Sequence, residues 1–290
     1  MRSSEVLRFD DLAPYLLLQN GNYLYKIPFR GDWAVLKVYY GSRSNWVRFT
    51  KSLNNALLGQ TSYWPATRRR VERECLELWT QHGFRVFPWY DDVEVVAPGC
   101  PPGGYLLCDF VDAPTLEDHL LDDDLPMDER LATYRRFLAE WGRRHDVAAR
   151  EREPRLVHEN GDFGHVMLVD GEFLWFDLEM VYRSRSRVEE LIGHEIIQYL
   201  WYVLRKTPAD LGERILAETA RHYPSRTRLA AAPDVFLDHP RWWMRLGRRL
   251  DARRPKSKKP TSKYAVARRL RRSVETSRDH EHTEPRHATR

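Results

Sequence analysis

Apolar and polar residues alternate along the first part of the chain, with turn signals between the alternating runs. Residues 14–40 have the pattern of antiparallel strands, with turns at Asn20-Gly21 and Arg30-Gly31-Asp32. The clearest strand is 33–40, which is rich in β-branched and aromatic residues. This part of the chain therefore predicts a small antiparallel sheet.

A helical pattern follows the sheet. Residues 67–83 have an apolar stripe and end at a glycine, Gly83, which predicts one helix over this range. Two further strands are predicted at 93–96 and 105–108, with a Pro/Gly-rich turn between them.

The second half of the chain is mainly helical in pattern. A short helix is predicted at 116–121, and long amphipathic helices at 127–145 and 188–204. Between the long helices, Asp170-Gly171 separates two apolar runs and predicts a β-hairpin. A sheet followed by helices predicts an α+β fold in two lobes.

The predicted organisation has three parts. An N-lobe with a small antiparallel sheet covers 1–104, and a helical C-lobe covers 105–240. A basic C-terminal segment covers 241–290, and we expect its last eighteen residues to be disordered.

Composition narrows the class of protein. Hydrophobic residues make up 42% and aromatic residues 12% of the chain, which excludes a chain that is disordered throughout. The sequence carries no secretory signal pattern and no uninterrupted apolar run long enough to cross a membrane. Cys75, Cys100 and Cys108 have no metal-ligand spacing. We therefore expect a cytoplasmic protein that is soluble or peripheral on a membrane.

Charge is concentrated near the C-terminus. The chain has a net charge of +5, and 241–272 holds fourteen Lys and Arg against one acid, Asp251. Trp242-Trp243-Met244 stands at the head of this segment, as in an amphipathic helix that lies on a membrane surface. Nucleic acid is the alternative partner, but no reading motif accompanies the charge, so we favour an anionic membrane surface at 241–272.

Three residues carry the candidate chemistry. Asp162 precedes the predicted hairpin and Asp177 follows it, which suits a pair in which one carboxylate accepts a hydroxyl proton and the other binds Mg²⁺. Lys37, on the clearest strand, is a candidate to hold nucleotide phosphates. The next helix offers Glu72, which we favour, or Glu74 to orient it. The alternative interpretation is that Lys37 is an ordinary surface lysine and that Asp162 and Asp177 are ordinary turn residues.

The sequence resembles a known family at these positions. Val35-Leu-Lys-Val38 looks like the strand lysine motif of kinases, and Glu72 matches the helix glutamate in its spacing from Gly83. Tyr105-Leu-Leu-Cys-Asp-Phe-Val111 resembles the hinge that binds adenine, which implies Cys108 and Phe110 as nucleotide neighbours.

Two further motifs extend the resemblance to about 14–205. Asn160-Gly-Asp-Phe-Gly-His-Val-Met-Leu-Val169 looks like the catalytic loop, and Trp175-Phe-Asp-Leu-Glu179 looks like the metal-binding loop. The ending Asp-Leu-Glu is similar to the Kdo/heptose lipopolysaccharide kinases and the InaA-like proteins near them. The resemblance implies a bilobal protein-kinase-like fold that uses ATP and Mg²⁺.

The chain departs from that family pattern in its catalytic loop. The position two residues before the aspartate, usually His, is Asn160, and His158 lies two residues earlier. The metal-binding Asn expected five residues after the aspartate is Met167, whose thioether is a poor ligand for a hard cation. His165 is the substitute ligand in our prediction, beside Asp177.

These observations together predict a phosphotransferase acting on a sugar hydroxyl of a lipopolysaccharide-type glycolipid at the cytoplasmic membrane face. Asp162 is the predicted catalytic base. Two alternatives stay open: a pseudokinase that serves as a membrane-attached binding or scaffold protein, which Met167 favours, and a soluble small-molecule kinase of the aminoglycoside type.

Overall fold

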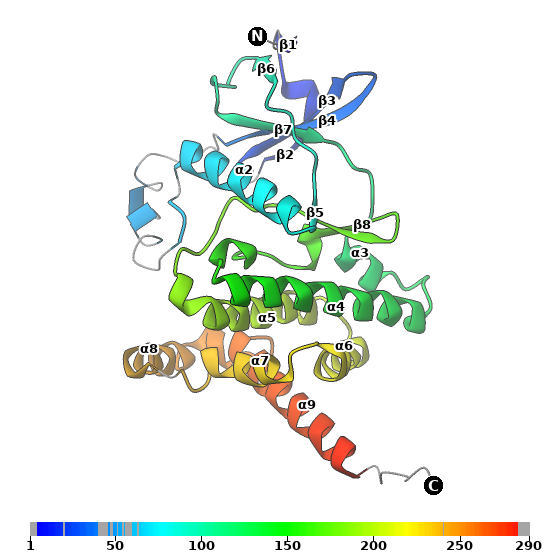
Figure 1. Ribbon diagram of the computed structural model, residues 1–290, viewed down its shortest axis with the longest axis vertical. Coiled ribbons are helices and arrows are strands. Elements are labelled where there is room, and N and C mark those ends of the chain that lie inside the picture. Colours follow the sequence, from blue (N-terminus) through cyan, green and yellow to red (C-terminus); the bar gives the residue numbers. More distant parts are fainter. Residues whose placement is uncertain are drawn as a thin grey trace. The chain divides into compact units, whose positions relative to one another are not determined.

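The computed structural model describes residues 5–19, 21–39, 46, 49–50, 52–53, 55, 60–62, 64–239 and 241–283. The chain forms two compact units. Met1–Ala113 and Val169–Arg183 form the first unit, and Pro114–Leu168 and Ser184–Arg290 form the second (Figure 1). The first unit therefore extends beyond residue 104, and the basic C-terminal segment belongs to the second unit.

The first unit is built on an antiparallel sheet of strand order β2-β3-β4-β7. Its strands are β2 (Leu16–Gln19), β3 (Tyr23–Phe29), β4 (Asp32–Val38) and β7 (Tyr105–Asp109). A short 3-10 helix, η1 (Ala13–Tyr15), leads into β2. The strands predicted within 14–40 and near 105–108 are confirmed, although Asn20 and Tyr40 lie outside the described residues.

The turn between β3 and β4 is made by Arg30 and Gly31, with φ of 49° and 83°. Two consecutive residues with positive φ are what a two-residue hairpin turn requires. Two parallel pairings complete the unit: β1 (Glu5–Arg8) with β6 (Val93–Val96), and β5 (Arg85–Val86) with β9 (Glu172–Trp175). The alternation in the sequence did not reveal these parallel pairs, because they join segments far apart in the chain.

Helix α2 (Pro65–Gln81) lies beside the sheet of the first unit (cyan in Figure 1). It begins two residues earlier than predicted, at Pro65, because proline suits the first helical position. Gly83 follows its end with φ of 71°, a conformation that glycine adopts without strain. Its buried face includes Val71, Glu72, Cys75, Leu76 and Trp79.

The core of the first unit lies on one face of the sheet. Ala34, Leu36 and Val38 of β4 are at most 1% exposed and belong to one apolar cluster with Ile27 and Leu107. Because successive side chains of a strand point to opposite faces, the intervening positions of β4 face the other side.

The second unit is mainly helical. Its longer helices are α4 (Met127–Glu151), α5 (Val188–Leu204), α6 (Ala209–His222), α8 (Trp242–Ala252) and α9 (Lys263–Thr283). Its short helices are α3 (Leu116–Leu121), α7 (Arg226–Ala231) and the 3-10 turns η2 (Pro154–Leu156), η3 (Phe163–His165), η4 (Arg185–Arg187), η5 (Ala232–Val235) and η6 (Pro255–Lys258).

Helices α4 and α5 carry the core of the second unit. Helix α5 has the bounds predicted from the sequence, whereas α4 continues beyond residue 145 to Glu151. Strand β8 (Val166–Val169) follows η3 and leads into the predicted hairpin turn, where Asp170 and Gly171 have φ of 54° and 78°. An α+β fold with an N-terminal antiparallel sheet and a helical C-terminal region is thus confirmed.

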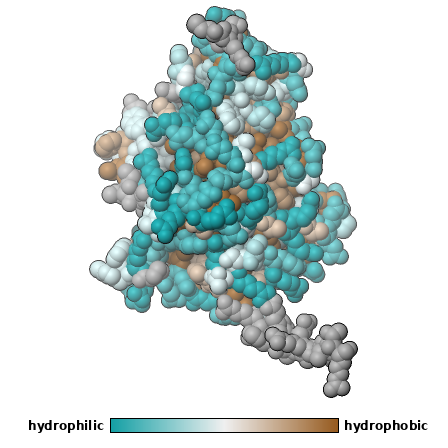
Figure 2. Space-filling model, in the orientation of Figure 1, coloured by the Kyte–Doolittle hydropathy of each residue, from teal (hydrophilic) through white to brown (hydrophobic). Residues whose placement is uncertain are grey.

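The C-terminal region is more ordered than the sequence suggested. Helix α9 continues to Thr283, so the prediction of a disordered tail is wrong for 273–283. Helix α9 is held by an apolar stripe that continues into this stretch: Val266, Ala267 and Leu270 are at most 1% exposed, and Val274 is 7% exposed. Hydrophilic residues, in teal, cover most of the surface that Figure 2 shows.

Candidate active site

Lys37 lies on the face of β4 opposite the hydrophobic core of the first unit, because its neighbours Leu36 and Val38 point into that core. Only 11% of its side chain is exposed. An enclosed ammonium group is costly unless charged partners surround it. The structure supplies such partners from α2 and from the segment after β9.

Three carboxylates surround the Lys37 ammonium. Nζ lies 2.8 Å from Glu72 Oε2, 2.8 Å from Asp177 Oδ1 and 3.1 Å from Glu179 Oε2. Burial by itself would lower the pKa of Lys37, but the three carboxylates, with Asp177 foremost, more than offset it and raise this pKa well above its ordinary value. Lys37 therefore carries its charge throughout the physiological range.

Glu72 is the helix glutamate that contacts Lys37. Its carboxylate also accepts a hydrogen bond from the Tyr39 hydroxyl. Burial raises the pKa of Glu72 and the Lys37 ammonium lowers it, and the net shift is upward. Glu74, the alternative from the sequence, is 45% exposed and pairs with Arg70 at 3.7 Å. Positions two apart on a helix face different directions, so only Glu72 reaches the lysine.

Asp177 is the most accessible of the three acids, with 33% of its side chain exposed against 8% for Glu179. Its backbone has φ of 63°, in the left-handed region that Asp tolerates better than most residues. Sparsely populated backbone conformations of this kind are frequent at functional sites. Asp177 is thus both positioned by Lys37 and open to solvent.

Glu179 is fixed by two further side chains of the first unit. The Arg68 guanidinium donates to one carboxylate oxygen, and the Asn22 amide donates to the other at 2.8 Å. Arg68 lies one turn before Glu72 on α2, so a single helix face supplies both an acid and a base to the cluster. Arg68 and Asn22 therefore hold the second acid beside Lys37.

Asp162 lies in the second unit, immediately before η3. Its Oδ1 accepts a hydrogen bond from the Gly164 amide at 2.8 Å, and His165 Nδ1 lies 3.4 Å from the same oxygen. The Asp162 side chain is 16% exposed. Its own turn therefore fixes the carboxylate while leaving part of it accessible.

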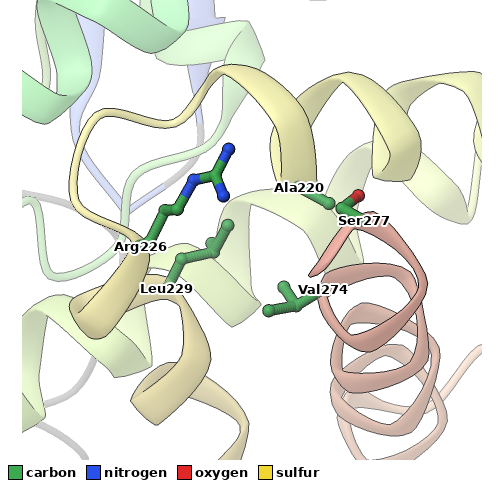
Figure 3. A pocket seen from close by; sticks show the side chains of 5 residues that line it. All are labelled: Ala220, Arg226, Leu229, Val274 and Ser277. Atoms are coloured by element: carbon green, nitrogen blue, oxygen red, sulfur yellow. The ribbon is translucent and has the colours of Figure 1, made fainter. Parts of the chain in front are cut away.

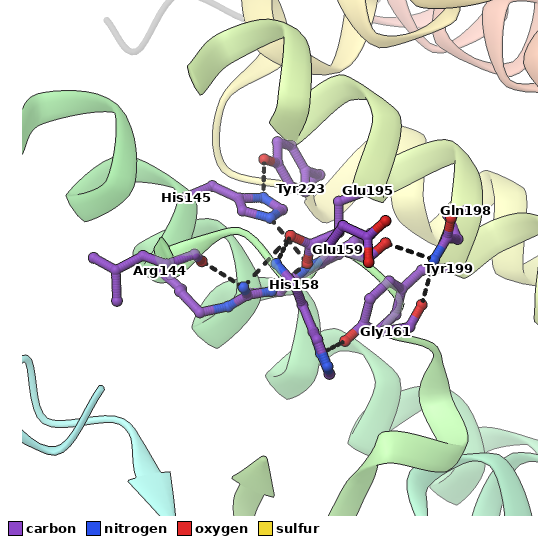
Figure 4. A network of polar contacts seen from close by, with 11 residues as sticks. Arg144, His145, His158, Glu159, Gly161, Glu195, Gln198, Tyr199 and Tyr223 are labelled. Atoms are coloured by element: carbon purple, nitrogen blue, oxygen red, sulfur yellow. Dashed lines mark hydrogen bonds and ion pairs between the residues drawn. The ribbon is translucent and has the colours of Figure 1, made fainter. Parts of the chain in front are cut away.

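Gln198 of α5 fixes the loop just before Asp162 (Figure 4). Its amide nitrogen donates to the carbonyl of Glu159 at 2.9 Å and to that of Gly161 at 3.3 Å. The Gln198 oxygen accepts from Lys263 Nζ at 3.1 Å, so α9 steadies the same side chain. Two backbone anchors from one side chain restrict the conformations open to this loop.

Glu195 of α5 anchors the start of the same loop (Figure 4). Its Oε2 accepts the His158 amide at 2.7 Å, and its Oε1 accepts from Trp141 Nε1 at 2.6 Å and from the Arg144 guanidinium. Both Glu195 and Arg144 are fully buried. Burial alone would raise the pKa of Glu195, but Arg144 and then His145 lower it below its ordinary range. Glu195 is therefore an ionised anchor inside the second unit.

Phe163, the residue after Asp162, ties the loop to the core of the second unit. Its ring centroid lies 5.2 Å from those of Phe137 and Tyr199, in edge-to-face geometry. The Tyr199 hydroxyl lies 2.8 Å from His158 Nδ1. Asp162 is thus held on both sides, by the buried ring that follows it and by the anchored loop that precedes it.

The predicted hinge residues lie at the end of the sheet. Cys108 is in β7 opposite Val35, and its buried thiol has a raised pKa because of desolvation. The Phe110 amide donates to the Trp33 carbonyl at 3.2 Å, and the Phe110 ring lies 3.7 Å from Lys26 Nζ. Strand β7 ends at Asp109, but the Phe110 amide is still hydrogen-bonded to β4, so the next backbone groups along the chain, from Val111 onward, follow this last bond to the sheet.

The predicted metal ligands belong to different units: Asp177 to the first and His165 to the second. Within the described part of the chain, no group of three or more His, Cys, Asp or Glu side chains is arranged to hold a metal ion. Met167 lies in β8, bridged to Thr115, and is half-buried. Of the three carboxylates around Lys37, Asp177 is the one with the largest exposed fraction.

Several positioning residues escaped the sequence analysis: Asn22, Arg68, Glu179, Glu195 and Gln198. Glu179 is part of the Asp-Leu-Glu motif. Its position two residues after Asp177 could have indicated that it lies near the same site. Glu195 and Gln198 were visible only as polar interruptions in the apolar face of α5. A polar residue on a buried helix face requires a partner, but the sequence does not say which one.

A separate pocket in the second unit lies between α6, α7 and α9 (Figure 3). It is lined by Ala220, Arg226, Leu229, Val274 and Ser277. It contains none of the predicted site residues, and we assign it no part in the chemistry.

Comparisons with known proteins gave structural matches only. No family model and no curated protein matches the chain. Among solved structures, it is similar to WaaP in complex with acyl carrier protein, at 13% identity and a TM-score of 0.38, over 82% of this chain and 90% of that chain. It is also similar to the kinase domain of maize SIRK1, sucrose-induced receptor kinase 1, bound to AMP-PNP, at 12% identity and a TM-score of 0.31, over 90% and 87% of the two chains.

The order of elements along this chain agrees with the kinase-like fold that the motifs predicted. The order of its elements is an antiparallel sheet with α2, then the strand β7, then helices around a loop and hairpin. Within the first unit, the strand lysine Lys37 meets the helix glutamate Glu72 and the post-hairpin aspartate Asp177. These are three of the residues at which the sequence resembles kinases.

Proposed function

We propose that this chain is an ATP- and Mg²⁺-dependent phosphotransferase whose acceptor is a sugar hydroxyl of a lipopolysaccharide-type glycolipid at the cytoplasmic membrane face. The observation that carries the proposal is the enclosed Lys37, which pairs with Glu72 and also reaches Asp177. A cation held rigidly by a helix carboxylate is the usual means of positioning nucleotide phosphates in kinases.

Lys37 holds the α- and β-phosphates in this proposal. Its contact with Glu72 fixes the ammonium in position before the nucleotide arrives, so little side-chain freedom is lost on binding. The raised pKa of Lys37 supports the role, because phosphates need a partner that stays positive.

The cluster around Lys37 offers carboxylate oxygen, the kind of ligand that a hard cation prefers. Three carboxylates surround Lys37, and Arg68 supplies one further positive charge, so acids outnumber bases in the cluster. Asp177 is the exposed acid and would hold Mg²⁺, which prefers carboxylate oxygen and keeps several waters. When bound, the cation would neutralise charge on the transferred phosphoryl group.

Asp162 orients the acceptor hydroxyl and accepts its proton in this proposal. Its anchored, partly exposed carboxylate suits that role, since a general base must be positioned before it transfers a proton. Cys108 and Phe110 remain the predicted neighbours of adenine. The first backbone groups outside the sheet, from Val111 onward, are those we expect to bind the adenine edge.

The glycolipid acceptor rests on the resemblance of the Asp-Leu-Glu motif and on the basic C-terminal segment. A peripheral protein needs no membrane-spanning helix. In the described ranges of this chain, none of the helices is both long and apolar enough to cross a bilayer.

The test is nucleotide binding with and without Mg²⁺, followed by ATP turnover with purified lipopolysaccharide and, in parallel, with aminoglycosides. We expect metal-dependent nucleotide binding and phosphate transfer to lipopolysaccharide. Transfer to aminoglycosides alone would replace the glycolipid acceptor with a soluble one. Nucleotide binding without transfer to any acceptor would favour the alternative below.

The alternative is a pseudokinase that binds nucleotide and a membrane partner without turnover. The observation in its favour is Met167, which occupies the position of a metal-binding Asn. An enzyme that uses one Mg²⁺ at Asp177, with water completing its coordination, does not need that Asn.

A further inference from the structure

Helix α8 presents the wrong face to solvent for a helix of a water-soluble protein. Trp242, Trp243, Leu246 and Leu250 are 67%, 54%, 53% and 56% exposed. On a helix of 3.6 residues per turn, positions 242, 246 and 250 follow one another along one side, and position 243 lies beside them. The apolar stripe of α8 therefore faces outward.

The opposite side of α8 is attached to the rest of the second unit through polar groups. The Tyr264 hydroxyl donates to the Arg248 carbonyl at 3.1 Å and to Asp251 Oδ2 at 3.0 Å. The Arg248 guanidinium lies 4.4 Å from the centre of the Phe236 ring. These contacts fix the rotation of the helix, so the outward apolar stripe is built into the fold.

The charges beside this stripe have one sign. Arg245, Arg249 and Arg253 are exposed on or next to it. Asp251, the single acid of 241–272, lies on the other side of the helix, where it accepts a hydrogen bond from Tyr264. Lys256, Lys258 and Lys259 follow, also exposed. An apolar stripe flanked by cations alone is complementary to an anionic lipid surface, where Trp rings occupy the headgroup level and Arg side chains meet phosphate.

In helix α9, by contrast, two of the basic residues form ion pairs within the fold. Arg269 pairs with Glu213 at 2.9 Å, and Arg271 pairs with Asp234 at 2.6 Å and Asp238 at 2.9 Å. These charges are already partly neutralised. Of the basic segment 241–272, the part best suited to contact lipid is therefore α8 with the lysines that follow it.

We propose that α8 lies in the plane of an anionic membrane, with Trp242, Trp243, Leu246 and Leu250 in the boundary between headgroups and acyl chains. A second copy of the chain is a poorer occupant of this face, since symmetric contact would bring the same arginines against one another. The proposal concerns attachment and does not depend on phosphotransfer.

The experiment is flotation of the full-length protein, without nucleotide, on vesicles of phosphatidylcholine alone or with 30% phosphatidylserine (about the charge density of an anionic leaflet). We expect binding to the anionic vesicles and little to the neutral ones. The double variants Trp243→Ser/Leu246→Ser and Arg245→Glu/Arg249→Glu should each weaken binding at least tenfold. Because these side chains are exposed, circular dichroism and the melting temperature should stay close to wild type.

The matched control for charge is Arg214→Glu/Arg221→Glu, which changes the net charge equally on the exposed side of α6. It should retain most of the binding. Equal loss in this control would mean that net charge, and not α8, attracts the protein, and would overturn the proposal.

A second measurement reports how deeply the Trp side chains of α8 enter the membrane. Brominated acyl chains should quench Trp fluorescence in the wild type, and most of that quenching should disappear in Trp242→Phe/Trp243→Phe. Unchanged quenching would place the lipid contact elsewhere and overturn the proposal. Two other results would also overturn the proposal, each in the absence of vesicle binding. One is a dimer that Trp243→Ser/Leu246→Ser dissociates, and the other is binding to single-stranded nucleic acid.

Discussion

The Lys37 ammonium lies 2.8 Å from Asp177 Oδ1, although 140 positions separate the two residues in the chain. Asp177 follows β9, and Lys37 is in β4, in a different sheet. The first unit therefore brings together a strand lysine and a post-hairpin aspartate that the sequence could only nominate separately.

Asp177→Asn should abolish Mg²⁺-dependent nucleotide binding while the protein stays folded. The amide loses the negative charge that a hard cation requires, but Asn tolerates the same left-handed φ of 63°. Calorimetric titration with ATP, with and without Mg²⁺, measures the effect. Asp170→Asn is the matched control, because Asp170 has φ of 54° and lies at the exposed hairpin turn. Wild-type metal dependence in Asp177→Asn would remove Asp177 from the metal site.

Asp162→Ala should lower turnover by at least about a hundredfold, the usual effect of losing a general base, with nucleotide affinity little changed. The Asp162 carboxylate also accepts the Gly164 amide at 2.8 Å, so Asp162→Asn serves as the comparison that keeps an acceptor oxygen there. Steady-state kinetics and nucleotide titration on both variants separate the two effects. A collapse of nucleotide affinity in Asp162→Asn would assign Asp162 to the nucleotide site.

Glu195→Ala should lower the free energy of unfolding by about 3 to 5 kcal/mol, because it removes the carboxylate that balances the charge of the buried Arg144 guanidinium. Urea denaturation measures this loss. Glu189→Gln is the control on the same helix, since Glu189 is 63% exposed and its ion pair with Arg228 should contribute at most about 1 kcal/mol. Similar losses in the two variants would show that the interior contacts of Glu195 add nothing beyond a surface pair.

The stability of the second unit should fall as the pH drops below neutrality, in part through His194. Burial first, and then Lys263 and Arg248, lower the pKa of His194 to about 3. Between pH 6.5 and about 3 the unfolded chain binds a proton at this residue and the folded chain does not. Stability is therefore fully present above pH 6.5 and is lost by at most about 1.4 kcal/mol per pH unit below it.

His194→Phe should reduce that slope, because Phe cannot bind the proton and preserves the ring beside Phe236. Urea denaturation at pH 7.5, 6 and 5 measures the slope. His222→Phe, at a 39% exposed position on α6, should leave the slope as in wild type. A slope unchanged in His194→Phe would assign the acid sensitivity to other groups.

Met167→Asn should raise turnover or metal affinity by supplying an oxygen ligand at the position where kinases usually have one. Turnover at several Mg²⁺ concentrations provides the measurement. An inactive wild type that becomes active on this change would favour the pseudokinase. If the wild type is active and Met167→Asn slows it, the half-buried Met167 packs within the second unit, and its interpretation as a missing ligand is wrong.

The C-terminal segment shows where the sequence was misleading. From the sequence we predict disorder in the last eighteen residues, because the ends of a chain are often poorly ordered. Helix α9 continues to Thr283 because Ala267 and Leu270 find partners inside the second unit. Removing 241–290 as a block would therefore expose core surface. This is why the membrane test uses point variants.

The sequence by itself determined the local elements of this protein. Alternation at period two gave β3 and β4, helical periodicity gave α2, α4 and α5, and Asp170-Gly171 gave the hairpin turn. These patterns are readable because backbone geometry fixes which neighbouring side chains share a face. The order of the motifs gave Lys37, Asp162 and Asp177 as candidates.

Only the tertiary structure decided which side chains meet. The sequence offers both Glu72 and Glu74, with a preference for Glu72, and only the burial of Glu72 against Lys37 decides between them. In the sequence, Glu195 is one of several polar residues in α5. In the structure, its charge is balanced inside the core by Arg144, which lies 51 positions away in the chain. Such choices depend on desolvation and on charge partners from distant segments. The burial of a side chain and its distance to a charged partner are defined only once the chain has folded.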